Sequence, residues 1–291
     1  MKKFIALSSW SRRAIGSILV AAIACMVACG DDSSASVEAN DEPVSEERSS
    51  SSKKLSSSSV IASEAKQSGS SSVIARTSCN VDADENCMKD SRDGQTYKTV
   101  SIGTQTWMAE NLNYAYIEVP YNSGNNTSDS TSWCVDNNLS NCTKYGRLYT
   151  WAAAMDSVVT WATNGKGCGY DKKCSPSYPV RGVCPEGWHL PTRAEWDVLF
   201  TAVGCSLTAC ENLKSSSDWN GTDTYAFSAL PAGDRDYGGN YNNMGNQANF
   251  WSSSEYSSGS AYIVFFYNDD FGALLTYGLK GRAFSVRCVK N

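Results

Sequence analysis

The chain has 291 residues with a formal net charge of −5 and a sequence pI near 5.0, and this acidic balance argues against a nucleic-acid-binding protein, which needs a dense basic surface. Its single histidine, His189, excludes metal sites built from several histidines, and any pair of a nucleophile and a histidine base would have to use this residue. The length leaves room for one or two domains.

The N-terminus has the pattern of a bacterial export signal. Lysines and arginines precede an apolar stretch at 14–27, which has the length of a signal-peptide core and is short for a membrane span. The end of this stretch, with small residues before Cys29, resembles a lipobox. We therefore expect residues 1–28 to be a lipoprotein signal peptide and Cys29 to carry the acyl chains; a plain secreted protein and a retained anchor are the alternatives.

A tether is expected to follow, at residues 29–78. Of the 49 residues at 30–78, 18 are serine and none is aromatic, so this segment cannot bury enough apolar surface to offset the entropy of ordering. Asp31 and Asp32 resemble the surface-export signals of some Gram-negative lipoproteins. We expect an exported chain that is anchored in the outer membrane, with the lipid bilayer as a partner of Cys29, and that is exposed at the cell surface.

A single folded domain is expected at 79–291. Of the 32 aromatic residues, 30 lie between Tyr97 and the C-terminus, so the apolar side chains that can form a core are concentrated there. Strands are predicted at 96–102 and 106–110 around a glycine turn, because polar and apolar residues alternate and Gly103 stands between them.

The remaining elements follow in chain order. The alanines at 149–155 predict a short helix. A longer helix is predicted to begin at the capping box of Thr192 and Glu195 and to end by Gly204. Beyond it, short apolar runs separated by polar turns predict a long structured loop at 232–249 and strands at 226–230, 250–253, 262–267, 273–277 and 283–290.

Ten cysteines lie in the folded region, and an even number in an exported chain indicates disulfides. Near neighbours pair with little loop entropy, and two distant cysteines are left over. The spacing favours the pairs Cys79–Cys87, Cys134–Cys142, Cys168–Cys174, Cys205–Cys210 and Cys184–Cys288. Exchange of partners among Cys168, Cys174 and Cys184 is an alternative, whereas a zinc site is disfavoured because no C-x-x-C motif occurs.

Five sequence blocks in order are similar to the Fibrobacter succinogenes major paralogous domain family. They are DGQTYKTV at 93–100, IGTQTWMAENLN at 102–113, YGRLYTW at 145–151, CPEGWHLPT at 184–192 and FSVRCVK at 284–290. The resemblance implies an exported protein, commonly a lipoprotein behind a serine-rich tether, and it implies no defined biochemical activity.

A more distant resemblance concerns the fold. Leu190-Pro191-Thr192 with Glu195-Trp196, and the closing SVRC at 285–288, look like the sulfatase-modifying-factor domain, a variant of the C-type lectin fold. This resemblance implies a disulfide-rich α+β domain with a twisted antiparallel sheet, flanking helices and long loops. Formylglycine-generating chemistry is not expected, because it needs two cysteines near the C-terminus and Cys288 is the only one in the last 80 residues.

The lectin resemblance implies a sugar-binding head. Sugar recognition uses aromatic rings beside carboxylates and amides, with or without calcium. The candidate ligand-binding residues are Asp234, Arg235, Tyr237, Asn240, Tyr241, Trp251 and Glu255, and Tyr256 adds an aromatic ring in the same region. Asp269 and Asp270 are weak candidates for calcium, although the tripeptides of calcium-dependent lectins are absent; no other cofactor and no catalytic residue is expected.

Alternatives accompany each of these assignments. Trp251 also suits a core position, residues 268–270 suit a hairpin turn, and Glu195 and His189 suit a helix cap and a hydrogen-bonded structural histidine. For the whole protein, a lectin-like head that binds polysaccharide or another surface protein is favoured. A structural envelope component without a soluble ligand is the alternative, and an enzyme acting on polysaccharide is less favoured because adjacent acids such as Asp234 and Asp236 are weak evidence for a glycosidase.

Overall fold

The computed structural model describes residues 77–116, 131–268 and 272–291. The expected signal peptide, Cys29, nearly all of the expected tether, and Asp269 and Asp270 lie outside the described residues. None of the helices in the described part of the chain combines the length and the apolar character needed to cross a membrane.

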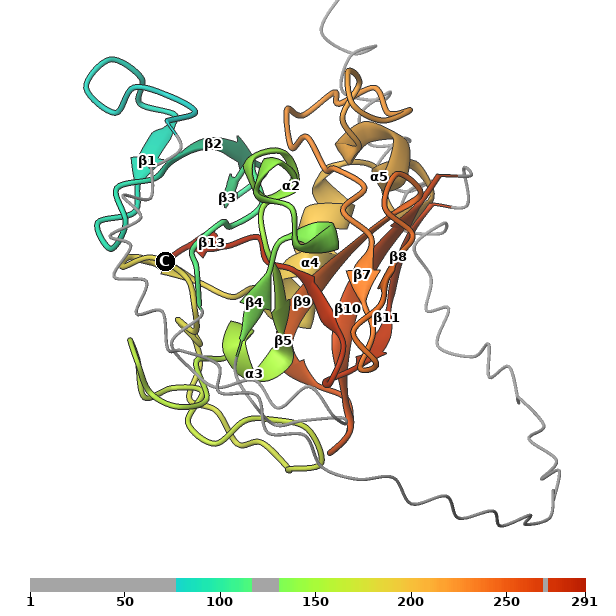
Figure 1. Ribbon diagram of the computed structural model, residues 1–291. Coiled ribbons are helices and arrows are strands. Elements are labelled where there is room, and N and C mark those ends of the chain that lie inside the picture. The colour runs from blue at the N-terminus through green and yellow to red at the C-terminus, as the bar shows by residue number, and fades with distance from the viewer. Residues whose placement is uncertain (1–76, 117–130, 269–271) are drawn as a thin grey trace, which may run out of the picture. The chain divides into compact units, whose positions relative to one another are not determined.

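One sheet joins the two ends of the folded region. Its strand order is β1–β2–β3–β13–β6, and the strands are β1 (Cys87–Lys89), β2 (Thr96–Ile102), β3 (Gln105–Met108), β6 (Trp188–His189) and β13 (Val289–Lys290). The C-terminal β13 pairs antiparallel with both β3 and β6, and Figure 1 shows it beside β3 although they are distant in sequence. The predicted hairpin is confirmed, with Gly103 at a φ of 59° in the turn between β2 and β3.

A larger, mainly antiparallel sheet forms the other half of the fold. Its central order is β11–β10–β9–β12–β5–β4, and β7 and β8 are attached beside β12. The strands are β4 (Ser132–Trp133), β5 (Leu148–Thr150), β7 (Asp234–Arg235), β8 (Tyr241–Asn242), β9 (Gln247–Glu255), β10 (Ser260–Tyr267), β11 (Ala273–Leu279) and β12 (Ala283–Ser285). Only β12 and β9 pair in parallel among the described strands of this sheet.

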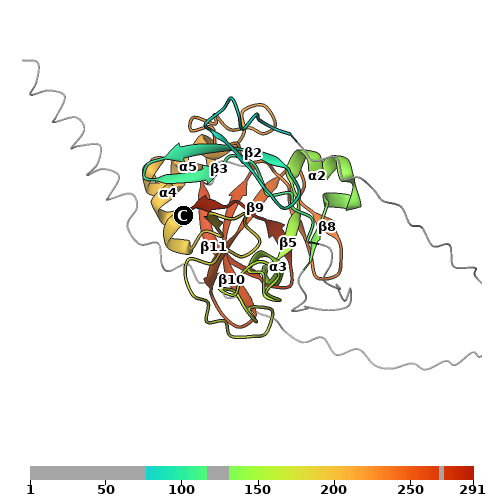
Figure 2. The same cartoon turned by 90° about the vertical axis from the view of Figure 1, so that its left-hand side faces the viewer.

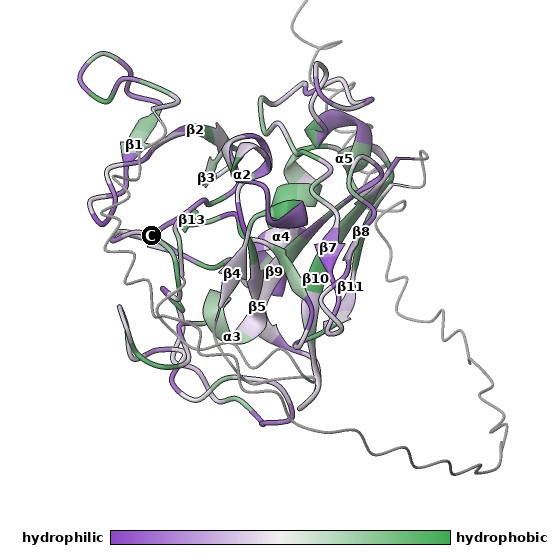
Figure 3. Ribbon diagram, in the orientation of Figure 1, coloured by the Kyte–Doolittle hydropathy of each residue, from purple (hydrophilic) through white to green (hydrophobic). Residues whose placement is uncertain are grey.

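Helices cover parts of this sheet. They are η1 (Val135–Asn137), α2 (Leu139–Tyr145), α3 (Trp151–Ala154), α4 (Arg193–Ala202) and α5 (Ser206–Leu213). The predicted capping box is confirmed, because the Thr192 side chain accepts from the Glu195 backbone and the Glu195 side chain accepts from the Thr192 backbone. Helix α4 contacts β9 and β10, and Figure 2 shows α4 and α5 together on one side. Figure 3 shows the apolar character of β10 and of α4.

Two apolar clusters fill the interior. One contains Trp151 and Trp251 together with Phe284, and the other contains Trp107 and Trp196 between the smaller sheet, α4 and the larger sheet. All four tryptophans are fully buried. The described residues therefore form a mixed α+β structure that is mostly sheet.

Between pairs of described residues, four disulfides stabilise this structure, namely Cys79–Cys87, Cys134–Cys142, Cys168–Cys174 and Cys184–Cys288. The fifth expected pair, Cys205–Cys210, is wrong, because the described residues show no disulfide between these two positions and the Cys210 thiol donates to the Tyr267 carbonyl. Cys205 caps α5 and Cys210 lies five residues further along it. Cys205 itself is not helical, with φ 76° and ψ 167°, and a disulfide needs a specific relative placement of the two residues that short sequence spacing alone does not provide.

Four predicted elements differ from the structure. Residues 226–230 form no strand, because Ala226 and Ser228 have φ angles of 54° and 53°. The predicted strand at 283–290 divides into β12 and β13, which join different sheets. The predicted loop at 232–249 contains the β7–β8 hairpin, and the predicted helix at 149–155 starts only at Trp151, after β5.

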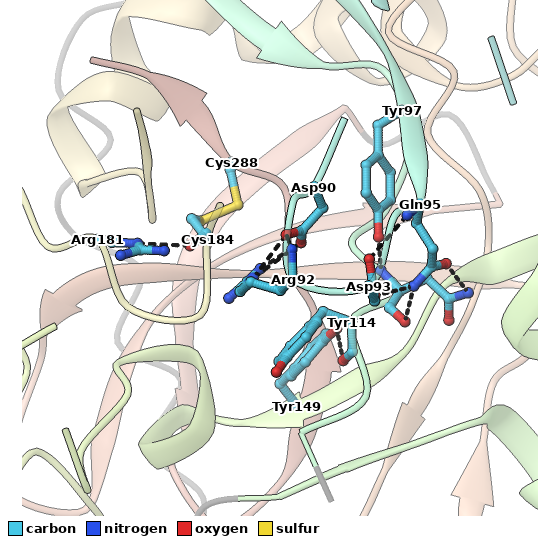
Figure 4. A network of polar contacts seen from close by, with 11 residues as sticks. Asp90, Arg92, Asp93, Gln95, Tyr97, Tyr114, Tyr149, Arg181, Cys184 and Cys288 are labelled. Carbon is cyan, nitrogen blue, oxygen red and sulfur yellow. Dashed lines mark hydrogen bonds and ion pairs between the residues drawn. A yellow bond between two sulfur atoms is a disulfide. The ribbon is translucent and has the colours of Figure 1, made fainter. Parts of the chain in front are cut away.

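A buried polar network holds the segment before β2 against the core (Figure 4). The Arg92 guanidinium forms a bidentate ion pair with the buried Asp90 carboxylate, at 2.7 Å for the shortest contact, and lies 4.0 Å from the Tyr114 ring centroid. The Tyr149 hydroxyl donates to the Tyr114 carbonyl at 2.7 Å. Burial raises the pKa of the neighbouring Asp93 carboxyl. The bonds of this network run from the segment before β2 to Tyr114 and Tyr149, so the network positions the N-terminal strands, although one Arg92 guanidinium nitrogen, Nη1, is buried without a hydrogen-bond partner.

Candidate functional site

The β7–β8 hairpin gathers five of the seven candidate ligand-binding residues. Asp234 and Arg235 lie in β7, opposite Asn242 and Tyr241 of β8. The Arg235 guanidinium lies between two rings, 4.1 Å from the Trp133 centroid and 5.7 Å from the Tyr241 centroid. The hairpin is thus held to β4 by a cation placed between aromatic rings.

The polar side chains of this hairpin mainly bond one another. The buried Asp234 carboxylate pairs with Arg282 at 2.5 Å, and the Asp236 carboxylate accepts from the Asn240 backbone and side chain. The Tyr237 side chain, at the turn, is 51% exposed. Most of the groups expected to contact a sugar therefore serve the hairpin itself, and Tyr237 is its exposed ring.

Trp251 is placed in the core. Its side chain is 0% exposed, its indole N–H donates to the Tyr149 carbonyl at 2.7 Å, and its ring centroid lies 4.6 Å from that of Phe284. A buried ring with its donor satisfied offers no face to a ligand. The core interpretation of Trp251 fits the structure, and a ligand-stacking role does not.

Glu255 lies away from the hairpin and belongs to a buried ion pair. Its carboxylate accepts from the Lys280 ammonium at 2.5 Å and from the Cys174 backbone at 2.9 Å. Lys280 also donates to the carbonyls of Lys172 and Ser258. This arrangement fastens the Cys168–Cys174 loop to the end of β9 and gives Glu255 a structural role.

A different set of rings, two exposed and one half-buried, lies where β9 and β11 end and β10 begins, near the start of α4. We call Tyr256, Tyr262 and Tyr277 the tyrosine cluster. The register of β10 and β11 places Tyr262 directly opposite Tyr277, so both side chains lie on one face. The Tyr256 ring stacks on Tyr277 with centroids 4.1 Å apart and planes within 3°, and it meets Tyr262 edge-on at 5.5 Å.

The local sequence explains why these rings reach solvent. Val264 and Phe266, further along the same face of β10, are 0% exposed and pack with the α4 residue Trp196. Helix α4 begins at Arg193, so it no longer covers this face of β10 at the position of Tyr262. Tyr256 and Tyr277 consequently remain 51% and 54% exposed.

Polar groups border the tyrosine cluster. The Arg193 guanidinium lies 4.8 Å from the Tyr262 ring centroid and donates to the Tyr262 hydroxyl at 3.2 Å. Its partner Asp197, one helical turn on, is more than half exposed at 3.9 Å from the Arg193 side chain, and burial raises the pKa of the Asp197 carboxyl. The surface therefore combines aromatic rings with a cation and a carboxylate, which suits a ligand that has apolar faces and hydroxyl edges.

His189 forms a hydrogen-bonded pair with Glu195, the glutamate of the capping box at the start of α4. His189 Nε2 lies 2.8 Å from a Glu195 carboxylate oxygen, and its Nδ1 lies 2.7 Å from Asn291 Oδ1. Burial lowers the pKa of His189, but the hydrogen bonds to Glu195 and Asn291 outweigh it and raise the pKa above its usual value. Burial raises the pKa of Glu195, but bonds from His189 and Thr192 outweigh it and lower the pKa. Both side chains thus fasten β6 and β13 to α4, which fits the structural interpretation.

The described residues contain no group of three or more histidine, cysteine, aspartate or glutamate side chains arranged to hold a metal ion. The candidate calcium ligands Asp269 and Asp270 lie outside the described residues. In the described part of the chain, the exposed groups suited to a ligand are therefore aromatic and hydrogen-bonding ones.

Sequence reasoning missed Tyr262 and Tyr277, although a signal for them exists. The predicted strands at 262–267 and 273–277 flank a polar turn, and antiparallel pairing across such a turn brings position 262 close to position 277. The exposure of these rings could not be predicted, since it depends on where α4 crosses the sheet.

The fold and its exposed rings define a disulfide-rich α+β domain with an aromatic surface. The family model of the Fibrobacter succinogenes major domain matches residues 100–290, and the chain belongs to this family. No curated protein and no solved structure was found to be similar to the chain.

Proposed function

We propose that the chain is an outer-membrane lipoprotein, anchored through Cys29, whose C-type-lectin-like head binds polysaccharide at the tyrosine cluster. The observation that carries the proposal is the group formed by the exposed rings of Tyr256 and Tyr277 and the half-buried ring of Tyr262 at one end of the larger sheet. Soluble proteins commonly use such exposed aromatic groups for binding.

The geometry favours a sugar over a purely apolar ligand. The face of a pyranose ring is apolar and packs on aromatic carbons, while its hydroxyls need hydrogen-bonding partners. The stacked Tyr256 and Tyr277 rings offer the carbon surface, and Arg193 and Asp197 offer a donor and an acceptor close by. A neutral polysaccharide meets both requirements.

The acidic chain makes strongly anionic polysaccharides poorer ligands, since the net charge is −5. Binding at the tyrosine cluster needs no metal ion, because rings and hydrogen-bonding side chains supply the contacts. The proposal therefore predicts binding of neutral chains that is insensitive to a chelator.

The test uses the purified full-length chain and insoluble cellulose, xylan, mannan and chitin. Depletion of the protein from solution is measured over a concentration series, with calcium and with a chelator. The expected result is saturable binding to at least one polysaccharide, equal under both conditions. Absence of binding to all four would contradict the proposal, and so would binding that requires calcium.

A further inference from the structure

A second feature of the surface is a groove of about 450 Å³ at the other half of the fold. It lies between the segment before β1, the strand β2, the segment after β3, the end of α2, and residues 215–230. Its volume is in the range of small-ligand sites. None of its lining residues belongs to the tyrosine cluster.

The lining of the groove is polar and nearly neutral. Its charged residues are Asp84, Glu110, Asp218, Lys98 and Lys144, three acids against two bases. Lys144 and Asp218 pair with each other at 2.9 Å on the rim. Such a balance does not suit a phosphate, which needs several cations, or a polyamine, which needs more carboxylates.

The uncharged part of the lining excludes an apolar ligand. Ala109, Ala226 and Leu230 are its apolar side chains, and no aromatic ring lines the groove. In contrast, Lys98, Thr99 and Asn86 present polar side chains that have no hydrogen-bond or ion-pair partner within the described residues. These groups are available to a ligand that carries hydroxyls.

The floor of the groove is held by a buried arginine. The Arg287 guanidinium, fully buried, donates to Asn111 Oδ1 and to the Ser228 carbonyl, each at 2.8 Å, and to the Phe227 carbonyl. Ala226 and Ser228 line the groove with left-handed φ angles of 54° and 53°, a conformation that non-glycine residues keep only when their surroundings enforce it. A preorganised wall of this kind reduces the entropy lost when a ligand binds.

We propose that this groove is a second binding site, which takes a short, neutral, polyhydroxylated ligand such as the end of an oligosaccharide. The site goes beyond the proposed function, because it shares no residue with the tyrosine cluster and has no aromatic ring. It recognises hydroxyls through amide, hydroxyl and ammonium groups, whereas the tyrosine cluster contacts the ring faces of a longer chain.

The chain offers a matched pair of variants to test the groove. Ser217 lines it and Ser216 does not, yet both are exposed neighbours. Ser217→Trp fills the groove, while Ser216→Trp places the same indole beside it. Both variants are compared with the wild-type full-length chain by calorimetric titration and by hydrogen exchange, using cellotriose, xylotriose and mannotriose as probes.

The expected result is that at least one trisaccharide binds and protects backbone amides at 98–99, 109–111 and 215–230. Ser217→Trp should weaken this binding tenfold or more, whereas Ser216→Trp should leave it within twofold. The double variant Tyr256→Ala with Tyr277→Ala should keep the protection, which separates the groove from the tyrosine cluster.

Three results would overturn the inference. They are no binding of any of the three trisaccharides, equal binding by the two tryptophan variants, and loss of the protection in the double tyrosine variant. Each of these results can occur while the chain still binds insoluble polysaccharide. The inference about the groove can therefore be contradicted without contradicting the proposed function.

Discussion

Removal of the Cys184–Cys288 disulfide should destabilise the head far more than removal of a short-loop disulfide. The two cysteines are 104 positions apart, whereas Cys134 and Cys142 are 8 apart. In the chain-entropy model, loops of these lengths correspond to about 4.7 and about 2.5 kcal/mol of stability at 25 °C. All four cysteines are buried, so the loss of packed sulfur is similar in both cases and the difference of about 2 kcal/mol comes from loop length.

The assay compares two double variants of the full-length chain, Cys184→Ala with Cys288→Ala and Cys134→Ala with Cys142→Ala. Unfolding by guanidinium is followed through tryptophan fluorescence without reductant. At about 2–4 °C per kcal/mol for a domain of this size, the long-loop variant should also melt about 9–19 °C below the wild type. Equal losses in the two variants, or a larger loss for the short loop, would refute the reasoning.

Two further predictions concern buried charges. The wild-type head should lose stability as the pH rises through the pKa of His189, which is raised above its ordinary 6.5. It should also lose stability as the pH falls through the pKa of Glu195, which is lowered below its ordinary 4.5. Glu195→Gln should flatten both changes in urea midpoints measured between pH 3 and pH 9, and an unchanged profile would contradict the pairing. Lys280→Met should lower the free energy of unfolding by about 3–5 kcal/mol, because it leaves the Glu255 carboxylate without its cation. Lys290→Met, at an exposed position, is the control and should change the free energy of unfolding little. Equal urea midpoints for the two lysine variants would show that the ion pair is not needed for stability.

The elements that sequence reasoning identified correctly are those fixed by local chemistry. The capping box of Thr192 and Glu195 and the turn at Gly103 depend on residues within a few positions of each other. The Cys184–Cys288 pair was also predicted correctly although the two cysteines are far apart in sequence. It was predicted by exclusion, after the near neighbours had been paired. The same preference for near neighbours failed at Cys205 and Cys210, which form no disulfide with each other among the described residues although they are five positions apart.

The positions of candidate site residues depend on distant partners, and sequence patterns contain little information about these. Trp251 is buried because β12, which lies beside β9, supplies Phe284, and β5, on the far side of β12, supplies the Tyr149 carbonyl. The segment at 226–230 alternates like a strand, yet hydrogen bonds from Arg287, about 60 residues away, hold it in another conformation. An aromatic residue in a polar region therefore does not by itself indicate which rings the fold leaves exposed.

The most direct test of the central claim is the affinity of the tyrosine cluster for the polysaccharide that binds best. Tyr256→Ala with Tyr277→Ala is compared with Tyr237→Ala, whose ring is equally exposed but lies on the β7–β8 hairpin. Loss of roughly 60 Å² of apolar contact per ring is worth about 1.5 kcal/mol, so the double variant should bind at least tenfold more weakly. Tyr237→Ala should bind like the wild type. Unchanged affinity in the double variant, with its fold intact by circular dichroism, would contradict the account.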